Sequence, residues 1–124
     1  MNVEALKQAA CDKVDELADE LINASREIHA HPELNFQEQF AHDLLTNMLN
    51  GHGVDVTRHA YDLETAFDAE VGTKGASIAV LCEYDALPGI GHACGHNVIA
   101  AAGLGAGLAA AAVAEQARGH GYGV

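Results

Sequence analysis

The first thirty residues carry hydrophobic side chains at alternating intervals of three and four, which is the spacing of one helix face. Acidic residues occupy the other faces, so the pattern predicts a helix over Val3–Ala30. Pro32 ends it, because the residue before a proline is disfavoured in helical geometry. The stripe fits a surface helix packed on a domain or, alternatively, a coiled-coil seam that its alanines would weaken. Its members are Val3, Ala10, Val14, Leu17, Leu21, Ala24 and Ile28.

A second helical pattern follows after a short break. Hydrophobic residues four apart predict a helix over Phe36–Leu49. Asn35 precedes it in the position of an N-cap, and Glu38 follows at the spacing of a capping box. Gly51 and Gly53 are typical of the end of such a helix.

Three strands are predicted in the middle of the chain. Val54–His59 alternates hydrophobic and polar residues, Thr65–Val71 does so more weakly, and Ser77–Cys82 is a continuous apolar run. The turn residues of Gly72–Gly75 predict a hairpin between the last two strands.

A final helix is expected over Val98–Arg118, with Asn97 as its N-cap. Gly103 and Gly107 lie four apart on one face, where they would allow another backbone to approach closely. The order of apolar strand, polar loop and helix is that of an α/β protein whose site lies at the carboxyl end of a strand.

Composition narrows the class of protein. The 124 residues, 49% of them hydrophobic, suffice for one small domain with a core. A net charge of -12 argues against nucleic acid and anionic membranes as partners. Three widely spaced cysteines and no recognisable signal peptide indicate a reducing cytoplasm without disulfides. The uncharged run Val98–Ala114 is just shorter than the roughly 18–20 residues that span a bilayer, so we expect no membrane segment.

The loop between the third strand and the last helix holds a concentration of side chains that can bind metals. Three glycines and a proline separate them, so the loop can turn steeply around a bound ion. The side chains are Glu83, Asp85, His92, Cys94 and His96.

Cys94 and His96 form the sharpest pair. In extended backbone, residues two apart project to the same side, so the thiolate and the imidazole would converge on one point. Sulfur and nitrogen together suit zinc or another divalent first-row ion. The alternatives are a structural cysteine beside a loop histidine, or a Cys94 nucleophile activated by His92 or His96. We interpret His92 as a supporting or structural residue.

Asp85 and Glu83 lie at the end of the apolar strand. A carboxylate there could bind metal or hold a liganding imidazole through its other nitrogen, and Asp85 could equally cap the following turn. A catalytic metal site also needs a general base, which the sequence does not offer convincingly. A metal site also closes with three or four ligands, and the candidates after the loop for the missing ligands are Glu115 and His120.

Three segments, in this order along the chain, resemble a known family. They are similar to motifs of the aminoacylase/carboxypeptidase-type metallopeptidase superfamily, in particular its amidohydrolase branch with hippurate hydrolase, indoleacetyl-amino-acid hydrolase and p-aminobenzoyl-glutamate hydrolase. The resemblance covers about residues 20–115. The segments are Ile28-His29-Ala30-His31-Pro32-Glu33-Leu34 with Glu38, then Glu83-Tyr84-Asp85-Ala86-Leu87-Pro88, and then Gly91-His92-Ala93-Cys94-Gly95-His96-Asn97.

The resemblance implies an α/β fold: part of a zinc-peptidase-like three-layer domain with a mixed sheet flanked by helices. It implies two divalent ions, zinc or manganese, that serve amide hydrolysis of N-acyl amino acids or dipeptides. Cys94 and His96 match the first two metal ligands, and Asp85 matches an aspartate that orients the site. Asn97 and Glu83 stand where many relatives have aspartate.

In this family, a glutamate pair, further liganding histidines and a dimerisation domain lie further along the chain. The resemblance therefore implies that residues 1–124 are an amino-terminal, partial catalytic domain of an enzyme that is a homodimer when intact. We expect the chain alone to be inactive and to bind metal weakly.

Overall fold

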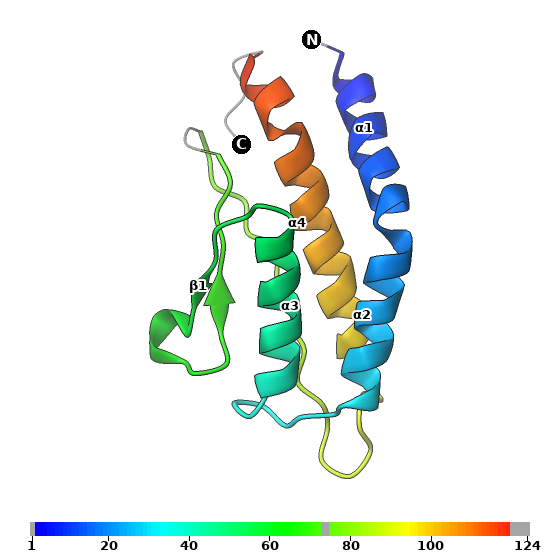
Figure 1. Cartoon of the computed structure of the whole chain (residues 1–124), viewed down its shortest axis with the longest axis vertical. Helices are drawn as coiled ribbons and strands as arrows, with labels where there is room; N and C mark the ends of the chain where they lie inside the picture. The colour runs from blue at the N-terminus through cyan, green and yellow to red at the C-terminus, as the bar shows by residue number, and fades with distance from the viewer. Residues whose placement is uncertain (1, 73–74, 120–124) are drawn as a thin grey trace.

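The computed structural model describes residues 2–72 and 75–119, in which four helices pack together beside a small lobe (Figure 1). Helix α4 packs against α1, α2 and α3. The predicted α/β class is confirmed, and in the described residues the sheet consists of β1 and β2. The elements are α1 (Val3–Glu16), α2 (Ala18–Ala30), α3 (Gln39–Gly51), β1 (Thr57–Arg58), η1 (Ala60–Asp62), β2 (Phe67–Asp68) and α4 (His96–Gly119).

Helices α1 and α2 form one rod that is interrupted at a single residue, Leu17 (Figure 1). The Leu17 backbone has φ -88° and ψ 0°, yet its N–H still donates to the carbonyl of Lys13 and its own carbonyl accepts from Leu21. The prediction of a continuous helix is therefore confirmed apart from this local break.

The hydrophobic core lies where α2, α3 and α4 meet. Leu17, Leu21, Ala24 and Ile28 of the predicted stripe are buried there, whereas Val14 in α1 remains 37% exposed. The part of the stripe from Leu17 to Ile28 is thus buried inside the molecule. It is not available to a second copy of the chain, so a coiled-coil dimer through this face is not favoured. The other core residues are Ala41, Leu45, Met48 and Leu49 of α3 and Ala100, Leu104 and Leu108 of α4.

Helix α3 begins three residues later than predicted, and Asn35 does not cap it. The carboxylate of Glu33 accepts hydrogen bonds from the backbone N–H groups of Phe40 (2.9 Å) and Ala41 (3.0 Å). These are the second and third residues of the helix, whose amides lack partners within it. A residue six positions before the helix therefore supplies the cap, because the chain from Leu34 turns back on itself.

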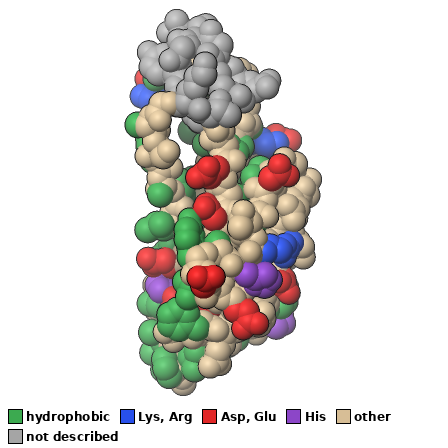
Figure 2. All heavy atoms as spheres, turned by 90° about the vertical axis from the view of Figure 1, so that its left-hand side faces the viewer, with side chains coloured by type: hydrophobic (Ala, Val, Ile, Leu, Met, Phe, Trp, Pro, Cys, Tyr) green, Lys and Arg blue, Asp and Glu red, His purple; other side chains and the backbone are tan. Residues whose placement is uncertain are grey.

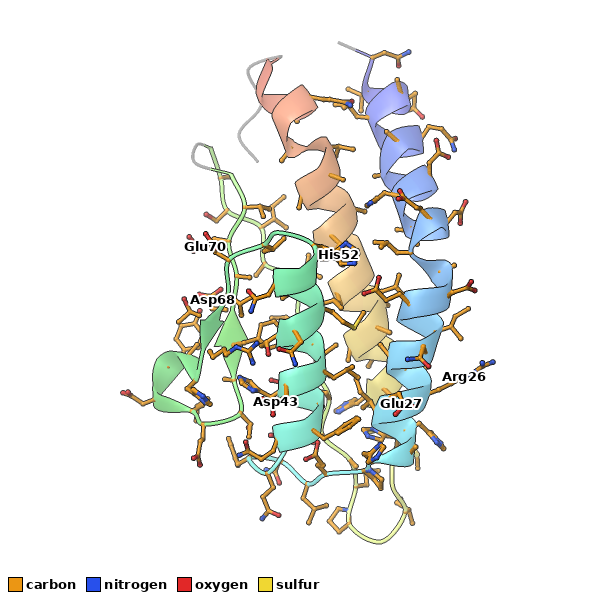
Figure 3. All side chains as sticks on the ribbon, viewed as in Figure 1. Arg26, Glu27, Asp43, His52, Asp68 and Glu70 are labelled. Atoms are coloured by element: carbon orange, nitrogen blue, oxygen red, sulfur yellow. The ribbon has the colours of Figure 1, made fainter. Side chains whose placement is uncertain are left out.

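Strands β1 and β2 are shorter than the predicted strands and pair with each other. They are antiparallel, with Thr57 opposite Asp68 and Arg58 opposite Phe67. Arg58 fastens this lobe to α3, because its guanidinium donates to Asn47 (2.8 Å) and lies 3.8 Å from Asp43. Figure 3 labels Asp43 on α3 and Asp68 in the lobe beside it.

The predicted strand over Ser77–Cys82 is not part of a sheet in the described residues. The segment makes no ladder with a neighbour there, and Ile78 and Leu81 are 90% and 71% exposed. Figure 2 shows hydrophobic side chains exposed along one edge of the molecule. The expected hairpin is therefore absent from the described residues, and Thr73 and Lys74 at its tip lie outside them. An apolar run indicates a buried strand only when neighbouring strands or helices cover it.

Helix α4 starts at His96, two residues earlier than predicted. Asn97 is not its cap: the side chain is buried and donates to the hydroxyl (3.0 Å) and carbonyl (3.3 Å) of Ser25 in α2. The stretch His96–Ala114 is long and apolar enough to cross a membrane by length and composition, yet here it packs against the other helices. The close approach predicted at Gly103 is confirmed, since the segment 81–82 lies against it. At Gly107 that prediction is wrong.

Candidate functional site

The loop that carries the candidate side chains is held against the connection between α2 and α3 (Figure 1). The N–H of Ala86 donates to the carbonyl of Glu33 at 2.7 Å, and Leu34 and Ala86 form a parallel bridge. Leu87 and Gly91 then close a tight turn with a bond of 2.9 Å. The loop therefore has fixed ends immediately before and after the turn.

His96 lies between two carboxylates. Its Nδ1 is 2.6 Å from Oδ1 of Asp85, and its Nε2 is 3.2 Å from Oε2 of Glu83. A carboxylate can only accept, so Nδ1 carries the proton in its bond to Asp85. The Nε2 of a neutral ring then presents a lone pair to Glu83, and two acceptors at this distance require a proton or a cation between them.

Cys94 lies on an exposed turn just before α4. The turn is closed by a bond of 3.1 Å from the N–H of Gly95 to the carbonyl of His92, and Gly95 has φ +84°. Our expectation of extended backbone between Cys94 and His96 is therefore wrong, because this glycine reverses the chain between them. The argument that the two side chains converge because of their spacing is lost with it. That both bind a metal now rests on the family resemblance and stays a prediction.

The chain is similar to curated hydrolases over most of its length. The Xaa-Arg dipeptidase of Mus musculus is 41% identical, with 91% of this chain and 28% of that protein covered. One of the subunits of the p-aminobenzoyl-glutamate hydrolase of Escherichia coli (strain K12) is 32% identical, with 86% and 24% covered. For thermostable carboxypeptidase 1 of Saccharolobus solfataricus the values are 34%, 83% and 29%. No family model matches the chain.

The chain belongs to the aminoacylase/carboxypeptidase-type metallopeptidase superfamily. The recognition from the three sequence segments is thereby confirmed. The chain spans about a quarter of the length of the curated relatives that it matches, 28% and 27% for the mouse and human Xaa-Arg dipeptidases.

The donors around His96 fit the divalent ion that a metallopeptidase family implies. Two ligands about 2.0 Å from one tetrahedral ion are about 3.3 Å apart. The 3.2 Å between Nε2 of His96 and Oε2 of Glu83 is close to this value. In metal sites the second nitrogen of a liganding histidine commonly donates to a carboxylate, as Nδ1 of His96 does to Asp85.

The described residues do not complete a metal site. Within them, no three histidine, cysteine, aspartate or glutamate side chains are grouped closely enough to hold an ion. Asp85 and Glu83 each contact His96, but at different nitrogens of its ring, so the three do not surround one point. Cys94 lies two residues before His96 in the sequence. The later candidates, the side chain of Glu115 and the whole of His120, lie outside the described residues.

Sequence reasoning left the first motif without a role. The structure places Glu33 between the cap of α3 and the N–H of Ala86. The motif itself held a signal, because Glu33 and Glu38 lie five residues apart within the segment that carries the family resemblance. Their partners could not be inferred, since they lie far along the chain.

His92 is buried under the site, and neither ring nitrogen has a hydrogen-bond partner among the described residues. Burial lowers the pKa of His92 below its usual 6.5, and the neighbouring His29 and His96 act in the same direction. Asp85 and the Ile28 carbonyl oppose this shift, although the carbonyl falls short of hydrogen-bond geometry. The site therefore favours a neutral ring at position 92.

This neutral ring should make the fold sensitive to acid. The unfolded chain binds a proton at His92 below the usual pKa of 6.5 and the folded chain does so at lower pH, so stability falls as the pH drops below 6.5. We expect His92→Gln to lose less free energy of unfolding than the wild type between about pH 7.5 and about pH 5.5. Urea unfolding of the metal-free chain at both pH values measures this, with the exposed His31→Gln as control. Equal losses in the wild type and His92→Gln would contradict the assignment.

Proposed function

We propose that this chain forms part of a metal-dependent amidohydrolase or dipeptidase that cleaves the amide bond of an N-acyl amino acid or dipeptide. The observation that carries the proposal is His96, whose Nδ1 donates to Asp85 while its Nε2 faces a second acceptor across 3.2 Å. The names of the relatives support the chemistry, since they include a dipeptidase, a p-aminobenzoyl-glutamate hydrolase and carboxypeptidases.

The residues of this chain would divide the work as follows. Cys94 and His96 bind the ion, Asp85 holds the His96 ring in its liganding tautomer, and Glu83 is a further candidate ligand. A divalent ion bound there, zinc or manganese, supplies Lewis-acid polarisation of the amide carbonyl and activation of water. Cys94 stands on the exposed turn just before α4, and its thiolate would be a further ligand if an ion were bound there.

The remaining parts of the proposal concern the intact protein. The chain contains no adjacent glutamate pair, which in this family supplies the general base and a further ligand. We therefore propose that residues 1–124 correspond to the amino-terminal part of the catalytic domain. As a separate proposal, the intact enzyme is a homodimer located in the cytoplasm. The chain alone should not hydrolyse N-acyl amino acids, and robust turnover would refute the assignment of the base to residues beyond it.

Alkylation tests the metal site directly. Cys11 and Cys94 are both exposed, so iodoacetamide should modify both in the metal-free chain. Excess Zn²⁺ should slow modification of Cys94 by about tenfold or more, because a liganding thiolate is withheld from the reagent. Cys11 should react at the same rate with and without the ion, which makes it an internal control. Peptide mass spectrometry follows each site separately.

The same experiment separates the ligand from the nucleophile. A Cys94 nucleophile would react with iodoacetamide at a rate independent of chelators and of added metal. That outcome, or equal protection of Cys11 and Cys94, would exclude the proposed metal site.

A further inference from the structure

We propose that Glu38 is a positioning residue for this site: through Thr65 and Tyr84 it fixes the backbone that aims Asp85 at His96. The inference rests on the proposed function insofar as it treats Asp85 and His96 as parts of the site. The glutamate belongs to the first sequence motif, at the start of α3, and does not itself touch His96 in the described structure.

Glu38 is buried, with both carboxylate oxygens occupied. One oxygen accepts from the backbone N–H of Phe36 at 2.8 Å, and the other accepts from the hydroxyl of Thr65 at 2.5 Å. Phe36 has φ +66°, a left-handed conformation that side-chain-bearing residues rarely adopt, so the first bond stabilises a strained turn. A buried carboxylate is costly unless such bonds compensate it, so this arrangement is specific.

Thr65 passes the constraint to Tyr84. The backbone carbonyl of Thr65 accepts a hydrogen bond from the hydroxyl of Tyr84, and Thr65 is itself buried. The ring of Tyr84 stacks on Phe67 at 6.1 Å with an interplanar angle of 6°. Burial, and then the negative charge of Glu38, raise the pKa of Tyr84, so its hydroxyl stays protonated and can donate.

Tyr84 and Ala86 flank Asp85 and are both anchored. Tyr84 is held through Thr65, and the N–H of Ala86 donates to the carbonyl of Glu33 at 2.7 Å. The side-chain bond of Tyr84 and the backbone bond of Ala86 therefore fix the main chain on both sides of Asp85. Between these two anchors, Asp85 makes its bond of 2.6 Å to His96.

A purely structural glutamate would predict a different result. Glu33 provides the comparison, since its carboxylate bonds to the first turn of the same helix and to no group near His96 in the described residues. Glu33→Gln weakens the α3 cap but leaves the Glu33 carbonyl in place for Ala86. It is therefore a matched control for loss of stability without loss of positioning.

The test is the exchange rate of the His96 Nδ1 proton with water, measured by NMR on the ¹⁵N-labelled, metal-free chain. The signal is identified by its disappearance in Asp85→Asn. We expect a protected proton in the wild type and in Glu33→Gln, and exchange about 3- to 10-fold faster in Tyr84→Phe and in Glu38→Gln, each of which loses one hydrogen bond of the chain of contacts. Tyr84→Phe keeps the ring stack on Phe67, so it decides the question if Glu38→Gln fails to fold.

The outcomes separate this inference from the proposed function. Wild-type exchange rates in folded Tyr84→Phe would overturn the positioning role, as would an unprotected proton in the wild type. If Tyr84→Phe exchanges at the wild-type rate while Zn²⁺ still protects Cys94 from alkylation, the positioning role is refuted and the metal site is retained. Conversely, accelerated exchange together with no metal protection of Cys94 would leave the positioning role intact and remove the metal site.

Discussion

Replacing Gly103 with alanine is expected to destabilise the fold by about 2–3 kcal/mol, the upper range for overpacking a well-packed position. A Cβ at Gly103 would lie 2.7 Å from the carbonyl oxygen of Leu81 and 2.8 Å from Sγ of Cys82. The first of these is a backbone atom, so the segment that leads into the candidate site would have to move away from α4. Urea unfolding followed by helical circular dichroism measures the change.

Gly107 provides the control on the same helix. A Cβ there would meet no atom of the described residues within 4 Å, and the residue is helical. Gly107→Ala should therefore stabilise the chain by up to about 1 kcal/mol, the difference in helix propensity between the two residues. A similar shift in the same direction for both substitutions would mean that segment 81–82 does not pack against α4 as described.

Asp85→Asn is expected to weaken binding of Zn²⁺ by about 10- to 100-fold, the usual effect of removing a carboxylate that orients a liganding histidine. The amide can present an NH₂ group to Nδ1 of His96, which favours the opposite tautomer and places a proton on Nε2. Competition against a chelating dye measures the affinity of the chain even when binding is weak.

Asp68→Asn serves as the control for charge. Asp68 lies in β2 and accepts from the hydroxyl of Tyr61 at 2.7 Å, so the substitution removes the same charge from a position in the small lobe. Its affinity for Zn²⁺ should match the wild type. If the two aspartate variants bind equally well, Asp85 does not orient a ligand.

The helices were largely predictable because their signals are local. The stripe through Leu21 and Ile28 identified the buried face of α2. What the sequence could not supply were partners far along the chain. The cap of α3 comes from Glu33, because the chain reverses at Phe36. Asn97 lies inside α4 and not before it, and its side chain bonds to Ser25, which is 72 residues away in the sequence.

The strands were harder to predict, since a strand is defined by its neighbours. The run Ser77–Cys82 has the composition of a buried strand, but whether it is buried depends on the chain that covers it. In the described residues its end at Leu81 and Cys82 lies against α4, while Ile78 stays 90% exposed. Val54–His59 paired with the next predicted strand, so two residues of each form the ladder.

For the site, the sequence identified the residue types, and the structure supplied their pairing. Asp85 and Glu83 could have bound a metal, held an imidazole or capped a turn, and these interpretations were equal from spacing alone. The bond from Asp85 to His96 across eleven residues favours the second for Asp85. Glu38 meets Thr65 across 27 residues, a relation that no local pattern encodes.

The exposed apolar segment 76–82 has a practical consequence for anyone purifying this chain. A segment that has no ladder partner among the described residues and exposes Ile78 and Leu81 is the kind of edge through which copies of a polypeptide aggregate. We therefore expect this segment to promote aggregation in concentrated samples more than in dilute ones. A lysine introduced at an outward-facing position of this edge is the simplest means of keeping the material in solution for spectroscopy.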